Sequence, residues 1–341
     1  MARVAINGFG RIGRTFFRSA WGHPDIEIVA VNDLGSIENL AYLLTYDSVY
    51  GRSPFEVKVD GKDLLVDGKK ITFCQEKEPS ALPWGAMDID VVVESTGFFT
   101  TYAGSKKHLD AGAKKVVISA PAGDDPADAG VQGATVLMGV NEDKLATCQI
   151  TSNASCTTNA TSPLVAILKE AIGIEKALLN TTHAYTASQT LVDGPSKKEF
   201  RDGRAAALNI IPSSTGAAKA TTKAHPELAG KFDGIAIRVP VPVGSLVDVT
   251  FVSSRDTTVE EVNAALVKAA ADPKWNNIFT ATDEPLVSSD IIGSRVGSIA
   301  DLSFTRVVGG NLVKVFAWYD NETSYTQTLV EHVAAAGRTL K

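Results

Sequence analysis

A glycine-rich turn near the N-terminus constrains the fold of this chain more than any other feature. Gly8, Gly10 and Gly13 form the pattern Gly-x-Gly-x-x-Gly. The pattern directly follows the apolar run Val4–Ile6 and opens a helical pattern. Glycines at these positions permit a tight turn, close approach of the backbone to a pyrophosphate, and close packing of helix on strand. The turn therefore predicts a strand–turn–helix unit that binds a dinucleotide.

An acidic residue at the end of the second expected strand supports this interpretation. Asp33 follows the run Ile26–Asn32 and stands twenty positions after Gly13. A carboxylate there accepts hydrogen bonds from the adenosine ribose and repels a phosphorylated ribose, so we expect NAD rather than NADP. In the alternative interpretation the glycines only turn the chain and Asp33 caps a helix, and the strand, helix and acid share this spacing by chance.

The first half of the chain alternates short β-rich runs with amphipathic stretches of helical length. We expect strands near 3–7, 26–32, 90–94 and 115–119. Helical periods fall at 11–21, 37–45 and 101–111. Asp60-Gly61 and Asp67-Gly68 predict hairpin turns in a meander at 55–74. Alternation of this kind predicts a parallel sheet covered by helices, a Rossmann domain of the α/β class.

The pattern changes after about residue 150 to longer β-rich segments, at 233–240 and 245–254, with helices at 258–271 and 324–340. A chain of 341 residues usually forms two domains. We therefore expect a dinucleotide-binding domain at 1–154, joined by the C-terminal helix 322–341. An α+β substrate domain with a mostly antiparallel sheet is expected at 155–321, and its long loop 186–204 is of a kind that often carries function.

Charge and cysteine content narrow the class further. A net charge of −6 gives no general attraction for nucleic acid or anionic lipid. Cys74, Cys148 and Cys156 show no CxxC pairing, which argues against a disulfide framework or a zinc site, and no metal is expected. The N-terminus resembles no signal peptide and no apolar run is long enough to span a membrane. We expect a cytoplasmic protein without membrane or nucleic-acid partners.

Cys156 differs from the other two cysteines in its polar surroundings. It lies in Ser155-Cys156-Thr157-Thr158-Asn159, before the helical pattern Pro163–Ala171. We therefore expect Cys156 at or near a helix N-terminus, where the helix dipole favours the thiolate and makes Cys156 a candidate nucleophile. Cys74 and Cys148 are interpreted as small buried apolar residues.

His183 follows the strand-like run that begins at Lys176. His183 is a candidate base for Cys156. A structural role, in which its ring nitrogens only form hydrogen bonds within the fold, is an equally good interpretation of the sequence. Spacing along the chain does not distinguish the two, because the pairing requires hydrogen-bond reach in space.

These residues resemble the glyceraldehyde-3-phosphate dehydrogenase family, and the resemblance covers essentially the whole chain. It depends on five blocks in the order of the family: the glycine turn, 155–159, His183–Thr186, Ser213–Lys219 and Arg238–Pro242. It implies that Cys156 attacks the substrate aldehyde, and that His183 raises the nucleophilicity of Cys156 and then acts as acid and base. Hydride transfer to NAD leaves a thioester, from which inorganic phosphate releases an acyl phosphate.

The resemblance also implies two anion pockets and a set of cofactor contacts. Thr186 and Arg238 correspond to the pocket for the phosphate of the substrate. The pocket for inorganic phosphate corresponds to Ser155, Thr157, Thr215 and Gly216, with Arg201 in support. The cofactor contacts correspond to Gly8, Gly10, Arg11, Ile12, Gly13, Asp33, Ser119 and Asn321. A homotetramer is expected, assembled through the long loop and the substrate-domain sheet.

The chain departs from the family pattern at two places. Ala160 stands where many members carry a second cysteine, and Thr323-Ser324 replaces the usual Trp-Gly. Three alternatives remain. Erythrose-4-phosphate dehydrogenase lacks the run Ser214–Gly216, aspartate-semialdehyde dehydrogenase would not need Arg238, and a scaffold protein without activity would not need Cys156 and His183.

Overall fold

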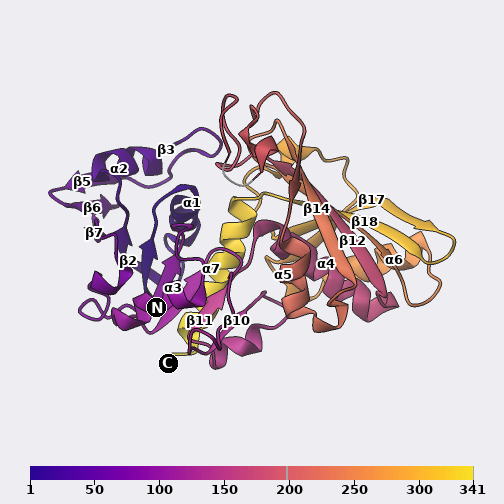
Figure 1. Ribbon diagram of the computed structural model, residues 1–341, viewed down its shortest axis with the longest axis horizontal. Helices are drawn as coiled ribbons and strands as arrows, with labels where there is room; N and C mark the ends of the chain where they lie inside the picture. The colour runs from indigo at the N-terminus through magenta and orange to yellow at the C-terminus, as the bar shows by residue number, and fades with distance from the viewer. Residues whose placement is uncertain (197–198, 341) are drawn as a thin grey trace. The chain divides into compact units, whose positions relative to one another are not determined.

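The computed structural model describes residues 1–196 and 199–340, and its chain divides into two compact units (Figure 1). Unit 1 consists of Met1–Ala154 and the C-terminal segment from Leu329, and unit 2 consists of Ser155–Thr328. Two lysines of the expected loop 186–204, at 197 and 198, lie outside the described residues. No helix within the described residues is long and apolar enough to cross a membrane.

Unit 1 is built on one large sheet. Its strands are β1 (Ala2–Asn7), β2 (Ile26–Asn32), β5 (Val57–Asp60), β6 (Asp63–Val66), β7 (Lys69–Cys74), β8 (Val91–Glu94), β9 (Lys115–Ile118), β10 (Gly133–Thr135) and β11 (Ile150–Ser152), with β3 (Tyr46–Asp47) and β4 (Gly51–Arg52) as a separate pair. Its helices are α1 (Arg11–Ala20), α2 (Ile37–Thr45), α3 (Tyr102–Asp110) and the second half of α7 (Thr323–Arg338), with 3₁₀ turns at η1 (Pro79–Ala81) and η2 (Glu142–Ala146).

The strand order of this sheet is β10-β11-β9-β8-β1-β2-β7-β6-β5. All pairs from β10 to β7 are parallel, and β5 and β6 add an antiparallel edge. Strand β1 lies between β2 and β8, so the strand order reverses there. In such sheets the crevice at the carboxyl ends beside this switch point binds the ligand. The expected Rossmann fold is confirmed.

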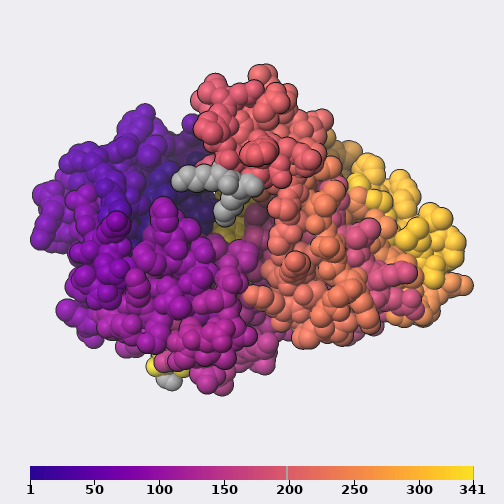
Figure 2. Space-filling model, in the orientation of Figure 1, coloured from indigo at the N-terminus to yellow at the C-terminus, as the bar shows by residue number. Residues whose placement is uncertain are grey.

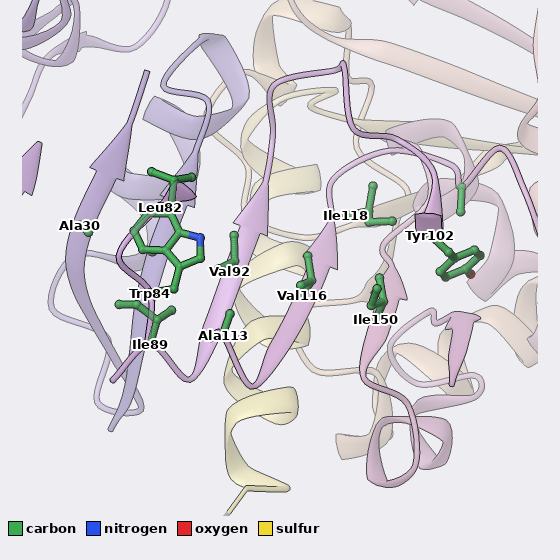
Figure 3. Close-up of a cluster of buried hydrophobic side chains, with 12 residues drawn as sticks. Ala30, Leu82, Trp84, Ile89, Val92, Tyr102, Ala113, Val116, Ile118 and Ile150 are labelled. Carbon is green, nitrogen blue, oxygen red and sulfur yellow. The ribbon is translucent and has the colours of Figure 1, made fainter. Parts of the chain in front are cut away.

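The central strands of unit 1 have continuous apolar sequences because both of their faces are buried. Every residue of β8 and β9 is buried, as expected for strands covered on both faces. Figure 3 shows one face of the sheet, where Val92, Val116 and Ile150 project from neighbouring strands and Trp84 and Tyr102 pack beside them. Trp84 is fully buried and Tyr102 is 2% exposed.

The expected meander at 55–74 is present as β5, β6 and β7. Asp67 and Gly68 have φ angles of 46° and 75°, the left-handed values that a tight hairpin requires. The short pair β3–β4 and the strands β10 and β11 had no clear pattern in the sequence.

Unit 2 contains a second sheet with helices packed against it. Its strands are β12 (Lys176–Ala184), β13 (Ile211–Ser214), β14 (Phe232–Val239), β15 (Ser245–Val252), β16 (Phe279–Thr282), β17 (Ser298–Val308) and β18 (Leu312–Tyr319). Its helices are α4 (Cys156–Ile172), α5 (Ala217–Ala224), α6 (Val259–Ala270) and the first half of α7, with 3₁₀ turns at η3 (Phe200–Gly203), η4 (Pro226–Leu228), η5 (Pro273–Trp275) and η6 (Ser288–Ile291).

This sheet has the order β13-β14-β12-β15-β18-β17-β16. Only β12–β14 and β16–β17 are parallel, so the expected mostly antiparallel sheet is confirmed. Burial alternates along β15, and helix α4 packs against β15, β17 and β18 (Figure 1). The alternation shows that one face of the sheet packs on helices.

Helix α4 is longer than its apolar pattern predicts. The apolar pattern covers only 163–171, whereas the helix begins at Cys156 and runs through Pro163. Ser155 caps this earlier start, because its hydroxyl accepts a hydrogen bond from the Thr158 backbone at 3.2 Å. The apolar pattern leaves out this polar first turn, and the expectation that Cys156 stands at or near a helix N-terminus is confirmed.

The described part of the long loop lies at the surface of unit 2. Leu191, Val192 and Phe200 are 83%, 72% and 90% exposed. Figure 2 shows the segment around residue 200 as a surface patch. Such a group of exposed apolar side chains is uncommon on a monomer.

Candidate active site

The glycine turn in unit 1 has the geometry that its sequence predicts. Gly8 has a φ of 94°, and a Cβ there would meet the Thr96 backbone nitrogen at 2.6 Å. A Cβ on Gly13 would meet the Gly8 carbonyl oxygen at 2.1 Å, so α1 packs directly against the end of β1. Gly10 precedes α1 and has open space where a Cβ would be. The first backbone N–H groups of α1 are therefore placed to bind an anion.

Asp33 is tied to the same turn. One carboxylate oxygen accepts from the Phe9 backbone at 2.6 Å, and the other accepts from the Gly35 backbone at 2.8 Å. Each oxygen retains a lone pair for a further donor. Asp33 lies beside Gly8 and Gly10 in the lining of a cavity of about 560 Å³. The cavity combines a phosphate-binding turn with a carboxylate that can bind ribose hydroxyls, so its residues fit a dinucleotide.

The other expected cofactor residues have different surroundings. The guanidinium of Arg11 forms an ion pair with Asp47 and lies over the Tyr50 ring at 5.4 Å, so the side chain is already engaged. Ile12 lies in the first turn of α1, and Ser119 follows β9 with its N–H bonded to the Glu94 carbonyl.

Asn321 belongs to unit 2 and is 5% exposed. Its Oδ1 accepts from the Gly244 backbone and from the Ser245 hydroxyl, both at 3.1 Å. This carbonyl oxygen is therefore used inside unit 2, and the side-chain amide group is the part left to orient a ligand.

The fold of unit 2 brings Cys156 and His183 together. Cys156 is the first residue of α4, and His183 is near the end of β12. Their Sγ and Nε2 atoms are 3.3 Å apart. This distance is within hydrogen-bond range for a sulfur atom. The sequence could not show whether His183 lies close enough to Cys156 to act as its base, and the structure shows that it does.

Arg238 completes this group from the neighbouring strand. His183 and Arg238 are register partners in the parallel pair β12–β14. The Arg238 Nη1 donates to His183 Nδ1 at 2.6 Å and to the Ala184 carbonyl at 3.1 Å. The Arg238 Nε is buried and has no hydrogen-bond partner among the described residues. A partly buried guanidinium with an unused Nε donor is suited to an anionic ligand.

The imidazole of His183 has two possible tautomers, and the contact with Arg238 selects one of them in the structure. When Arg238 donates to Nδ1, the proton lies on Nε2 and points to sulfur. For Nε2 to present a lone pair to the thiol, Nδ1 must carry the proton and donate to the Ala184 carbonyl at 2.7 Å, and the Arg238 Nη1 donor must turn away from Nδ1. Burial and then the charge of Arg238 lower the pKa of His183 to about 3.

The electrostatics of Cys156 differ from expectation. We expected the helix N-terminus to favour the thiolate, but burial raises the pKa of this thiol. Arg238 and hydrogen bonds from Thr157 act in the opposite direction and are smaller. Desolvation therefore outweighs these contributions and favours the neutral thiol.

Tyr319 is a site residue to which the sequence analysis assigned no role. Its hydroxyl is 2.9 Å from the hydroxyls of both Thr157 and Thr181. Its ring packs edge-on against His183 with centroids 5.9 Å apart. It lies in an aromatic stretch of β18 that reads as ordinary core, so no local signal distinguished it.

The remaining phosphate-binding candidates do not contact the pair directly. The hydroxyl of Thr186 is 2.8 Å from that of Ser188, and that of Thr215 accepts from the Ala217 backbone. Gly216 precedes α5. Arg201 is near Glu199 with its side chain 65% exposed. Among the described residues, the structure joins Cys156, His183 and Arg238, whereas Thr186 follows β12, Thr215 and Gly216 follow β13, and Arg201 lies in η3.

Both sites together define a class of protein, a dinucleotide-binding oxidoreductase with a cysteine–histidine pair on its second domain. Comparison with family models identifies the family within this class. Residues 2–102 match the NAD binding domain of glyceraldehyde 3-phosphate dehydrogenase, and residues 155–321 match its C-terminal domain. The chain belongs to the glyceraldehyde-3-phosphate dehydrogenase family.

Curated relatives agree over the full length. The chain is 49% identical over 334 residues to glyceraldehyde-3-phosphate dehydrogenase 1 of Bacillus subtilis, with 97% of each chain covered. It is 50% identical over 334 residues to glyceraldehyde-3-phosphate dehydrogenase of Geobacillus stearothermophilus, again with 97% of each covered. Identity to glyceraldehyde-3-phosphate dehydrogenase of Mycobacterium avium is 50% over 346 residues, with 99% of each covered.

Proposed function

We propose that the chain oxidises D-glyceraldehyde 3-phosphate to 1,3-bisphosphoglycerate, with inorganic phosphate as second substrate and NAD as hydride acceptor. The observation that carries this proposal is the 3.3 Å approach of the Cys156 sulfur to His183 at the start of α4, with Arg238 on the other side of the imidazole. That group supplies a nucleophile, a proton carrier and an anion-binding cation.

The chemistry follows from these three side chains. His183 Nε2 takes the thiol proton, and the Cys156 sulfur bonds to the aldehyde carbon, whose oxygen then takes that proton to give a hemithioacetal. His183 next accepts the hydroxyl proton as hydride leaves carbon, and a thioester on Cys156 remains. NAD, when bound, supplies the hydride acceptor. Phosphate oxygen then bonds to the thioester carbon, and the C–S bond breaks with its electron pair going to sulfur. The sulfur takes back the proton held on His183, and the acyl phosphate leaves.

The proposed roles of the other residues follow their chemistry. Thr186 and Arg238 bind the phosphate of the substrate, and Ser155, Thr157, Thr215 and Gly216 bind inorganic phosphate, with Arg201 in support. The backbone of Gly8, Gly10, Arg11, Ile12 and Gly13 binds the pyrophosphate, Asp33 binds the ribose, and Ser119 and Asn321 bind the nicotinamide side. We propose 1–154 with 322–341 as the cofactor domain and 155–321 as the catalytic domain.

We further propose a homotetramer that acts in the cytoplasm. The exposed Leu191, Val192 and Phe200 of the long loop support assembly, and so do Ile235 and Phe304 on the sheet of unit 2. Light scattering of the purified chain tests this, with a mass four times that of the 36.0 kDa chain as the expected result. A monomer at working concentration would contradict it.

The decisive experiment is an assay of NADH formation with glyceraldehyde 3-phosphate and phosphate. Turnover is expected to require both, and erythrose 4-phosphate is expected to be a poor substrate. NADH formation at the same rate without phosphate would contradict a phosphorylating mechanism. Faster turnover of erythrose 4-phosphate would assign the chain to the related enzyme instead.

A further inference from the structure

A group of buried polar side chains lies beneath the cofactor cavity, and no step of the proposed reaction uses it. Glu94 ends β8 and is 1% exposed, while His108 on α3 is fully buried. A carboxylate so far from water requires hydrogen-bond donors around it, because burial of an isolated charge is very unfavourable.

Glu94 receives four such donors. One oxygen accepts from the Thr96 backbone at 2.8 Å and from the Thr96 hydroxyl at 2.5 Å. The other accepts from Asn7 Nδ2 at 2.5 Å and from His108 Nε2 at 3.0 Å. Both oxygens are thus fully used, and Glu94 joins the ends of β1 and β8 through its side chain.

Trp84 determines which nitrogen of His108 carries the proton. The indole Nε1 of Trp84 is 3.0 Å from His108 Nδ1. An indole N–H can only donate, so Nδ1 accepts and the proton lies on Nε2, directed at Glu94. Nε2 is also 3.3 Å from Asn7 Nδ2, as expected for two donors that share one carboxylate oxygen.

One arm of this network reaches the aromatic part of the cavity lining. The Thr96 hydroxyl donates to Glu94 and accepts from the Phe98 backbone at 3.0 Å. Thr96, Phe98 and Phe99 all line the cavity. The position of Glu94 therefore determines the path of this segment.

The second arm reaches another part of the lining. Asn7 Oδ1 accepts from Asn32 Nδ2 at 2.7 Å. Asn32 in turn accepts from the Glu76 N–H at 2.8 Å and donates to the Glu76 carbonyl at 2.9 Å. Glu76 and its neighbours Lys77 and Glu78 line the same cavity.

We propose that Glu94 and His108 are positioning residues for the dinucleotide, because one buried carboxylate holds two separate segments of the cavity lining in place before the ligand arrives. This inference rests on the proposed use of NAD. Its physical basis is preorganisation, since a lining that is already ordered loses less entropy when the ligand binds.

The test uses the full chain and ADP-ribose, which fills an adenosine and pyrophosphate site and undergoes no hydride transfer. Glu94→Gln keeps the shape but offers one acceptor oxygen and one NH₂ group, which would face the existing donors. We expect ADP-ribose to bind about tenfold more weakly by calorimetry. The KM for NAD should rise in parallel, with kcat at saturating NAD nearly unchanged.

Two substitutions at His108 distinguish a positioning role, which requires its hydrogen bonds, from a role in packing alone. His108→Gln can still donate to Glu94 and accept from Trp84, so its ADP-ribose affinity should be within about threefold of the native chain. His108→Leu can do neither, and its affinity should fall about as far as that of Glu94→Gln. Equal affinities in the two His108 variants would overturn the proposal.

Asn141→Ala is the matched control for lost stability. Asn141 is a buried residue of unit 1 that donates to the Thr135 carbonyl and accepts from the Leu137 backbone, outside the cavity lining. The Asn141→Ala variant should have a lower melting temperature and an ADP-ribose affinity within about twofold of the native chain. Both quantities would change together only if loss of stability by itself weakened ADP-ribose binding. The inference is wrong if Glu94→Gln binds ADP-ribose like the native chain, or if Asn141→Ala loses as much affinity. Failure of the native chain to bind ADP-ribose would instead contradict the use of NAD.

Discussion

The two units build their sites from different parts of the polypeptide. In unit 1 the proposed anion site consists of backbone N–H groups at the start of α1, made accessible by glycines and supported by Asp33. In unit 2 the reactive group consists of the side chains of Cys156, His183 and Arg238, which α4, β12 and β14 bring together. A backbone site depends on local conformation, whereas a side-chain site depends on strand register and helix placement.

The largest expected effect separates the two sites by their chemistry. Cys156→Ala should reduce NADH formation by at least about 10⁴-fold, because no other group can hold the acyl intermediate. Affinity for NAD should stay nearly native, since the cavity in unit 1 contains none of the altered atoms. Steady-state assays and calorimetry measure both quantities. Retained dehydrogenase turnover would rule the mechanism out.

A matched glycine pair tests the backbone site. Gly13→Ala places a Cβ 2.1 Å from the Gly8 carbonyl oxygen and should destabilise the protein by about 3 kcal/mol. Gly10→Ala has open space for its Cβ in the unliganded chain, so it should weaken NAD binding with little loss of stability. Thermal melts and NAD titrations distinguish the two. Similar melting temperatures for both variants would contradict this picture.

Acid should destabilise unit 2 more steeply than unit 1. Burial is the main cause that lowers the pKa of His183 to about 3 and of His225 to about 4 in unit 2, and of His332 to about 3 in unit 1. The unfolded chain takes up these protons below an ordinary pKa of about 6.5 and the folded chain does not, so stability falls as pH drops below that value. Each histidine removes about 1.4 kcal/mol per pH unit.

Hydrogen exchange at pH 7, 6 and 5, corrected for intrinsic rates, measures this difference for each unit. His225→Gln should flatten the slope of unit 2, and His332→Gln should flatten that of unit 1. Identical slopes in both units of the native chain would show that other groups control acid stability.

The Asp33→Asn substitution tests whether the Asp33 carboxylate causes a preference for NAD over NADP. Loss of the carboxylate removes the repulsion of a phosphorylated ribose, so the ratio of kcat/KM for NADP to that for NAD should rise about tenfold, or about 1.4 kcal/mol. Assays with both cofactors measure the ratio. No change would mean that Asp33 acts only on the turn through Phe9 and Gly35.

The smallest effect is expected at Arg11. Its guanidinium is engaged by Asp47, so only its backbone remains for the pyrophosphate. Arg11→Ala should change NAD affinity by less than about threefold, because a partly exposed ion pair contributes little. A tenfold loss would show that the cofactor site in unit 1 also depends on this side chain.

Much of unit 1 could be predicted because its information is local. The expected strands at 26–32 and 90–94 and the helix at 37–45 correspond closely to β2, β8 and α2. Strands β10 and β11 have three residues each, which is too short for a periodic pattern. The expectation that Cys156 stands at or near a helix N-terminus is confirmed, because Ser155 caps α4 and Cys156 is its first residue.

The sequence alone predicted the fold class, which the structure confirms, and the proposed cofactor turn with Asp33 and candidate nucleophile, since each depends on spacing within a few tens of residues. Only the tertiary structure decided that His183 lies within hydrogen-bond distance of Cys156 and that Arg238 and Tyr319 contact the His183 imidazole. It also decided that burial raises the pKa of the Cys156 thiol. Strand register and desolvation involve residues far apart in the chain, and no local pattern encodes their distance in space.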